Sequence, residues 1–312
     1  MAARPAEREE DQRAAMRVVS RVFKASMSCE WEVALRLRQP RYRDATWWTW
    51  SEQGEVVGAL VCAPLRWHSS TWSAPREGYT LGALAVLPER RGHNIGRRLI
   101  ASVMAERSAA GAGRGLLFAG ISPHMYTPLG FRARQVSAFS VPAPALLALQ
   151  ATPTQLNPLD PYVDLEELAG AWRRSHRGSG PAVYVHRDPA DVERSLAQGV
   201  DDVFFRLAGP GPHSGTLRLR DLPEADAVQI VECALETRGS SPCAALPSAL
   251  AAVASLTLQL GRSRVQGWWP SVWGDPAVAL GIGGVLHPHP VPPMTVGLDL
   301  DLPLLLWASD EL

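Results

Sequence analysis

YTLGALAVLPERRGHNIG, from Tyr79 to Gly96, is the stretch that decides the fold of this chain. Its first part, Tyr79–Leu87, is apolar and bounded by polar residues, which predicts a strand buried on both faces. Pro88 removes a backbone donor and ends that strand. Apolar residues then recur at helical spacing, which predicts a helix that ends within Ala109–Gly113. These residues are Leu99, Ile100, Val103 and Met104.

The turn between this strand and this helix has the composition of an anion-binding site. The first N–H groups of a helix have no partners within it, and the helix dipole makes that end attractive to a phosphate. Gly92 and Gly96 allow a close approach of the backbone, while Arg90, Arg91 and Arg97 add positive charge. On the glycines alone, an ordinary tight turn is an equal alternative.

Val86–Leu99 resembles motif A of the GNAT superfamily of acyl-CoA N-acyltransferases, which reads Arg/Gln-x-x-Gly-x-Gly/Ala after a strand. The sequence departs from the motif at Asn94, which stands where the first pyrophosphate-binding glycine is expected. Asparagine tolerates the left-handed conformation best among non-glycine residues, so we expect the turn to keep its shape. The resemblance implies an α/β (α+β) fold, in which the GNAT mixed sheet is flanked by helices.

The resemblance also implies where acetyl-CoA, the co-substrate of the family, would bind. Its pyrophosphate would lie on the loop, and a bulge in the central strand would free N–H groups for the thioester oxygen. The loop residues are Arg91, Gly92, His93, Asn94, Ile95, Gly96 and Arg97, and the strand residues are Leu84, Ala85 and Val86.

A second motif follows the predicted strand Gly115–Ile121, which is joined to the first strand by the helix as a βαβ unit. The stretch ending at Phe131 resembles the family's motif B, Phe-Tyr-x-x-x-Gly-Phe, with Met125 in place of the first aromatic residue. Its tyrosine, Tyr126, would face the gap between the two strands. A phenol suits protonation of a departing thiolate, so we predict Tyr126 as the general acid. A tyrosine that only packs is the alternative.

The general base is marked less clearly. Many members of the family have a glutamate on the central strand, and that position falls near Thr80, which cannot act as a base. Glu77 and His68 are the nearest candidate bases, although each is more often an ordinary surface or edge residue. Ordered water in an apolar site that lowers the pKa of the amine is an equal alternative.

Length and composition exclude several classes of protein. The chain has 312 residues, enough for two domains, and its 31 basic residues balance its 31 acidic ones. This balance does not favour nucleic acid or an anionic membrane as a partner. The cysteines are too scattered for disulfides or zinc, and we find no signal peptide and no membrane-spanning run. We therefore expect a cytoplasmic protein without a metal. The cysteines are Cys29, Cys62, Cys233 and Cys243.

The chain is predicted to have three parts. Residues 1–145 form the GNAT domain, residues 146–160 a proline-rich linker, and residues 161–312 a second, degenerate GNAT-like α/β domain. Asp221–Asp226 lacks the glycines and basic residues of the first loop, so we do not expect the second domain to bind CoA. His287 and His289 have no third ligand at usable spacing, which favours a proline-rich loop over a metal site.

Further elements follow from periodicity and turn residues. In the first half we predict helices at 9–27 and 31–37 and a hairpin of strands 46–50 and 55–63, with a third strand near 65–71. In the second half we predict helices at 165–174, 189–198, 225–236 and 246–260. Strands are predicted at 182–186, 203–207, 215–219, 265–269 and 294–300.

The resemblance implies direct transfer of an acetyl group from acetyl-CoA to a primary amine of a small molecule. A CoA-binding or assembly protein without turnover, and a protein or peptide N-acetyltransferase, are the alternatives, and a homodimer is left open. The tandem architecture also resembles bacterial polyamine and aminoglycoside acetyltransferases. Tryptophans are candidates for walls of an acceptor cleft, with simple packing as the alternative. They are Trp31, Trp47, Trp48, Trp50, Trp67 and Trp72.

Overall fold

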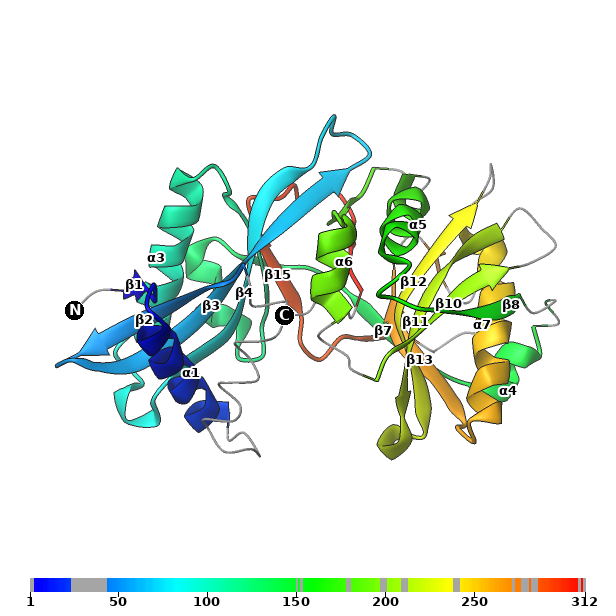
Figure 1. Cartoon of the computed structure of the whole chain (residues 1–312), viewed down its shortest axis with the longest axis horizontal. Helices are drawn as coiled ribbons and strands as arrows, with labels where there is room; N and C mark the ends of the chain where they lie inside the picture. The colour runs from blue at the N-terminus through cyan, green and yellow to red at the C-terminus, as the bar shows by residue number, and fades with distance from the viewer. Residues whose placement is uncertain are drawn as a thin grey trace.

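The computed structural model describes most of the chain. The described residues are 3–23, 44–149, 151, 154–177, 181–196, 201–208, 213–237, 242–270, 273–275, 281, 286–307 and 310. The helix predicted at 31–37 lies outside them. The described residues form two mixed sheets with helices packed against them, side by side along the long axis (Figure 1).

The first sheet has the strand order β1-β2-β3-β4-β5-β15-β6, and β9 joins it by pairing with β3 and with β16. Its strands are β1 (Ala3–Pro5), β2 (Thr46–Glu52), β3 (Glu55–Ser69), β4 (Arg76–Val86), β5 (Arg114–Phe118), β6 (Arg132–Ala133), β9 (Val183–Val185), β15 (Pro293–Val296) and β16 (Leu304–Leu305). Its helices are α1 (Glu9–Phe23) and α3 (Ile95–Ala109). Both helices bury apolar faces against the sheet, which forms the first core.

The second sheet has the order β14-β7-β13-β12-β11-β10-β8. Its strands are β7 (Ser137–Pro142), β8 (Gln155–Leu159), β10 (Val203–Ala208), β11 (His213–Leu222), β12 (Ala227–Thr237), β13 (Arg264–Trp269) and β14 (Leu286–Pro288). The remaining helices are α4 (Ala143–Leu147), α5 (Leu165–Arg177), α6 (Pro189–Leu196) and α7 (Pro242–Gln259).

The hairpin predicted near the start of the chain is confirmed. Gln53 and Gly54 have φ angles of 51° and 88°, and they join β2 to β3. Positive φ at both central residues matches the right-handed twist of the flanking strands. The separate strand predicted at 65–71 is instead the far end of β3, which continues to Ser69.

The central βαβ unit is also as predicted, with β4 and β5 parallel and α3 between them. Parallel pairing ends at Leu81 opposite Leu117, so the two strands separate beyond that point. There β4 carries a bulge: the register with β3 shifts, and Ala83 has a φ of 49°. The expected interruption of the central strand is therefore present, beginning one residue before Leu84.

The second sheet contains a comparable unit, in which α7 connects the parallel strands β12 and β13. The helix predicted at 225–236 is wrong, because this segment is β12, paired on both sides by β11 and β13. Its loop Asp221–Asp226 is consequently a hairpin turn between β11 and β12. The corresponding turn between β12 and α7 includes residues 238–241, which lie outside the described residues.

The predicted linker does not mark the boundary between the two sheets. β7 precedes residue 145 yet pairs with β13 of the second sheet, and β8 forms an edge of that sheet from within the expected linker. In the opposite direction, β15 from the C-terminal part lies between β5 and β6 of the first sheet (Figure 1). Each half of the chain therefore completes the sheet of the other.

A buried arginine ties three parts of the second half together. The guanidinium of Arg187 forms ion pairs with Glu232 of β12 and, at 2.5 Å, with Asp310 near the C-terminus. Its Cζ lies 3.8 Å from the ring centroid of Trp172 in α5. Asp310 also accepts a hydrogen bond from the backbone N–H of Trp307. This buried cluster therefore connects Asp310 to β12 and to α5 through Arg187.

Candidate active site

The loop between β4 and α3 has the geometry of an anion-binding turn. Gly92 has a φ of 84°, and Asn94 has φ 61° and ψ 17°, so the left-handed conformation expected for Asn94 is confirmed. Asn94 is the N-cap residue of α3, but its side chain makes no capping hydrogen bond. The N–H groups in the first turn of α3 are therefore available to a ligand.

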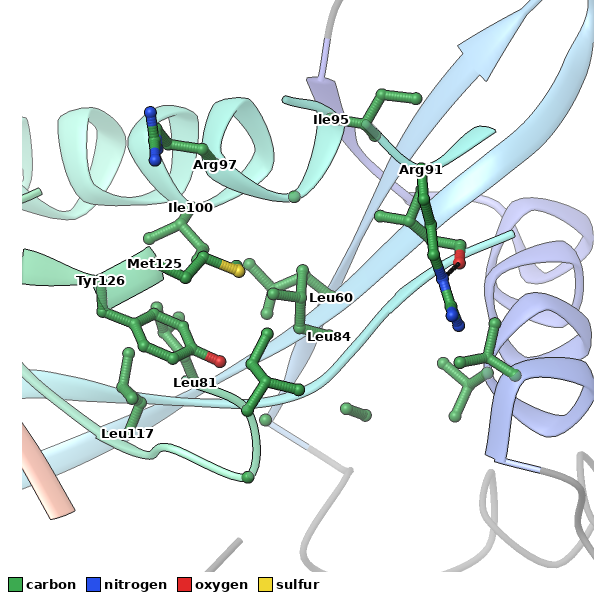
Figure 2. Close-up of a pocket in the computed structure, with 18 of the residues that line it drawn as sticks. Leu60, Leu81, Leu84, Arg91, Ile95, Arg97, Ile100, Leu117, Met125 and Tyr126 are labelled. Carbon is green, nitrogen blue, oxygen red and sulfur yellow. Dashed lines mark hydrogen bonds between the residues drawn. The ribbon is translucent and has the colours of Figure 1, made fainter. Parts of the chain in front are cut away.

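A cavity of about 920 Å³ lies against this loop. Its wall joins the loop, the bulge at Ala83 and Leu84, and Tyr126 (Figure 2). Gly96 lines the cavity, and a Cβ atom built on it would be 3.4 Å from Cε of Met125. The cavity therefore brings together the two motifs that the sequence analysis singled out.

Most of the predicted loop and strand residues line this cavity. They are Leu84, Val86, Arg91, Gly92, Asn94, Ile95, Gly96 and Arg97. Two of the predicted residues do not line it. His93 is exposed, with Nδ1 3.1 Å from the carbonyl oxygen of Arg91, and the side chain of Ala85 is buried in the core of the first sheet.

The arginines of the loop give the cavity a positive rim. Nε of Arg91 donates a hydrogen bond to the carbonyl oxygen of Val86 at 3.3 Å, which holds this side chain over the end of β4 (Figure 2). Arg90 also lines the cavity and forms an ion pair with Glu52 at 3.7 Å. Arg97 lies on the first turn of α3. An anionic ligand at this rim would meet both cations and free N–H groups.

Tyr126 places a phenol inside the cavity. The residue is 6% exposed, and its ring packs edge-on against Phe131 with the centroids 6.5 Å apart. In Figure 2 the hydroxyl group points into the space beside Leu81 and Leu84. Burial raises the pKa of Tyr126 above its usual value, so the group stays protonated at neutral pH. None of the described residues forms a hydrogen bond with this hydroxyl, which leaves it free to donate to a ligand.

The two candidate bases lie away from this cavity. Glu77 is exposed and lies opposite Arg66 in the antiparallel pairing of β4 with β3. Six residues separate it from the bulge at Ala83, about 20 Å along an extended strand. His68 lies on β3, and its ring stacks on Tyr184 with a centroid distance of 5.6 Å. The structure does not bring either residue to Tyr126, and the described part of the cavity wall contains no carboxylate or imidazole.

Other parts of the cavity wall were not identified as site residues from the sequence. Val19, Val22 and Phe23 of α1 line it, as does Val291 near the C-terminus. The first three lie on the apolar face of the amphipathic helix predicted at 9–27. Val291 carried no such signal, because its place depends on the pairing of β15 with β5.

None of the predicted tryptophans that the structure describes lines the cavity. Trp47, Trp48, Trp50 and Trp67 are buried, so packing accounts for these four. The ring of Trp72 lies 4.3 Å from Cζ of Arg76 and does not line the cavity, while Trp31 lies outside the described residues.

Within the described ranges, no group of three or more His, Cys, Asp or Glu side chains is arranged to hold a metal ion. In the same part of the chain, no helix combines the length and apolar character needed to cross a bilayer.

The chain is similar to known proteins in sequence over its first part and in fold over most of its length. Residues 2–134 match the family described as "Acetyltransferase (GNAT) domain". No curated protein matches the sequence. Among solved structures, a probable N-acyltransferase of unknown function from Enterococcus faecalis has a TM-score of 0.73 at 12% identity, over 94% of this chain and 71% of its own.

Two other structures are similar over both halves. A GCN5-related N-acetyltransferase from Kribbella flavida has a TM-score of 0.66 at 16% identity, over 94% of this chain and 71% of its own. A protein of the same description from Anabaena variabilis has a TM-score of 0.69 at 14% identity, over 94% and 72%. These likenesses extend the shared fold to both sheets.

Proposed function

Residues 2–134 of this chain belong to the GNAT acetyltransferase family, which makes the protein an acyltransferase, and on this premise we propose that it acetylates a primary amine of a small molecule. Acetyl-CoA is the proposed donor. One observation carries the proposal: a single cavity is lined by the anion-binding loop, the bulge of β4 and the phenol of Tyr126. These are the parts needed to hold the pyrophosphate, polarise the thioester and protonate the thiolate.

Each part of the cavity has a proposed task. The N–H groups at the start of α3 bind the pyrophosphate, with Arg91 and Arg97 as nearby cations. The N–H groups freed between Ala83 and Val86 stabilise the oxygen of the thioester as it gains negative charge. Tyr126 donates its proton to the sulfur as the C–S bond breaks.

The amine requires no protein base in this proposal. It arrives as an ammonium ion and gives one proton to water before its nitrogen attacks the thioester carbon. As the C–N bond forms and the C–S bond breaks, the nitrogen loses a second proton, which restores the phenol of Tyr126 through water. The products are the amide and the free thiol of CoA. The role of water is supported by the lack of a carboxylate or imidazole in the described cavity wall.

The experiment that tests the proposal is a thiol-release assay with acetyl-CoA and a panel of primary amines. Transfer through a ternary complex predicts intersecting lines when the concentrations of both substrates are varied. Binding of acetyl-CoA without thiol release toward any small amine would contradict the proposal. It would favour a non-catalytic CoA-binding protein or an acetyltransferase acting on proteins.

We predict that Asn94→Gly tightens CoA binding or leaves it unchanged. Asn94 has a left-handed conformation, which glycine adopts without steric cost, and its side chain makes no capping bond. Calorimetry on the parent and the variant measures the effect, which should stay within about threefold unless binding tightens. A strong loss of affinity would mean that the Asn94 side chain itself contacts the ligand.

We also predict that one CoA binds per chain. α3 carries Arg97 and Arg98 in its first two turns, whereas α7, its counterpart in the second sheet, contains no charged residue. A pyrophosphate at the start of α7 would lack those helix-borne cations. The stoichiometry from calorimetry checks this, and a value of two would show that the second half also binds CoA.

A further inference from the structure

We infer that the acceptor is a primary amine carried on an uncharged apolar body, such as an arylalkylamine, and not a polyamine. This inference rests on the proposed function and narrows its substrate class. It follows from the apolar part of the cavity wall, from the exposure of two apolar side chains there, and from the lack of a carboxylate among the described lining residues.

Much of the cavity wall outside the phosphate-binding loop is apolar. α1 contributes Val19, Val22 and Phe23, and β3 contributes Leu60. The segment after β5 contributes Ile121, and Val291 comes from the segment before β15. Four separate parts of the chain thus present hydrocarbon to one space, where an apolar ligand would gain free energy from each buried methylene.

Two of these side chains are largely exposed. Phe23 and Ile121 are 58% and 54% exposed, although both belong to the cavity lining. Large apolar residues scattered singly on a surface need no explanation, but two that line one cavity indicate a ligand-binding groove. Burying them against an apolar ligand would remove this exposed surface from water.

The apolar wall disfavours an acceptor with several ammonium groups. Among the described lining residues the charged side chains are Arg90, Arg91 and Arg97, which the pyrophosphate of acetyl-CoA would neutralise in the ternary complex. A second ammonium group buried against the hydrocarbon would lose its hydration and would find no carboxylate on this part of the wall. Apolar surroundings also favour the neutral form of the reacting amine. An apolar monoamine can therefore lose its proton to water without a protein base.

The first test measures kcat/KM for straight-chain amines from propylamine to hexylamine, for phenethylamine, and for putrescine and spermidine. We expect kcat/KM to rise by up to about fourfold per methylene. We expect phenethylamine to exceed spermidine by at least about tenfold. Equal or higher values for the polyamines would overturn the inference and leave the proposed function intact.

The second test substitutes two residues whose side chains are equally exposed. Ile121→Asp places a carboxylate in the cavity, whereas Leu300→Asp places one on the surface outside it, and both parent residues are 54% exposed. We expect Ile121→Asp to raise KM for phenethylamine at least about tenfold, without changing the affinity for acetyl-CoA. Leu300→Asp should leave both unchanged. Unchanged kinetics in Ile121→Asp would contradict the inferred position of the acceptor.

A final measurement separates failure of the inference from failure of the proposed function. If no amine in the panel is acetylated, the proposed function fails for small amines. Calorimetry of phenethylamine with the CoA-saturated protein then decides the inference. Binding that Ile121→Asp weakens would support an apolar amine site, and no binding to the parent would overturn it.

Discussion

Replacing Tyr126 with phenylalanine is expected to lower kcat by about 10²–10⁴-fold, the usual contribution of a general acid. The substitution keeps the ring and its edge-on contact with Phe131. Because no described residue bonds to the hydroxyl, removing it leaves no protein group without its partner. Folding and acetyl-CoA affinity should therefore hardly change, and the loss should fall on kcat.

Thiol release under saturating acetyl-CoA and amine measures this effect, with thermal unfolding and calorimetry run in parallel. Tyr79→Phe is the matched control, because Tyr79 is also a buried tyrosine but does not line the cavity. Its turnover should stay close to that of the parent. Turnover of Tyr126→Phe within about twofold of the parent would remove Tyr126 from the mechanism. A loss of stability alone would favour a purely packing role.

Replacing Arg187 with methionine is expected to destabilise the protein by about 3–5 kcal/mol, as when one partner of a buried ion pair is removed. Arg187 is 3% exposed, and its guanidinium is shared by Glu232 and Asp310. Without it, the buried carboxylate of Asp310 would lose the guanidinium it pairs with, and Glu232 would lose one of its cationic neighbours. Methionine retains most of the hydrocarbon stem, so the loss of stability measures mainly the removal of the positive charge.

Urea unfolding of parent and variant gives the free energy of unfolding for this comparison. Arg206→Met is the control, since Arg206 pairs with Glu167 at the surface. Exposed pairs contribute about 0–1 kcal/mol, so this control should lose no more than that. A similar small loss in Arg187→Met would show that the buried cluster does not hold the end of the chain.

The part of the fold that sequence alone could predict is the part fixed by local contacts. The strand, the turn and the helix from Tyr79 to Ala109 follow each other directly. The spacing of apolar residues in the strand differs clearly from that in the helix. Asn94 was predictable because left-handed geometry is a property of a single residue. Tyr126 could be chosen as a candidate because it belongs to a motif, and the structure places it in the same cavity as the loop.

The misassigned parts depend on contacts that are distant in sequence. Residues 225–236 have apolar positions that fit a helix as well as a strand, and only pairing with β11 and β13 decides for a strand. Glu77 is a candidate because it lies three residues before Thr80, and His68 because it lies on the preceding predicted strand. An extended strand carries such neighbours far from the bulge, so closeness in sequence did not mean closeness to the cavity.

The position of β15 has a consequence for the way the protein is made. β15 pairs with β5, yet it begins about 175 residues later in the chain. At 5–20 residues per second, a ribosome reaches β15 roughly 10–35 s after β5. During that time the edge of β5 is open, and an open edge is a template for pairing with other chains. The nascent first sheet therefore passes through an aggregation-prone stage in every round of synthesis, which ends only when β15 arrives.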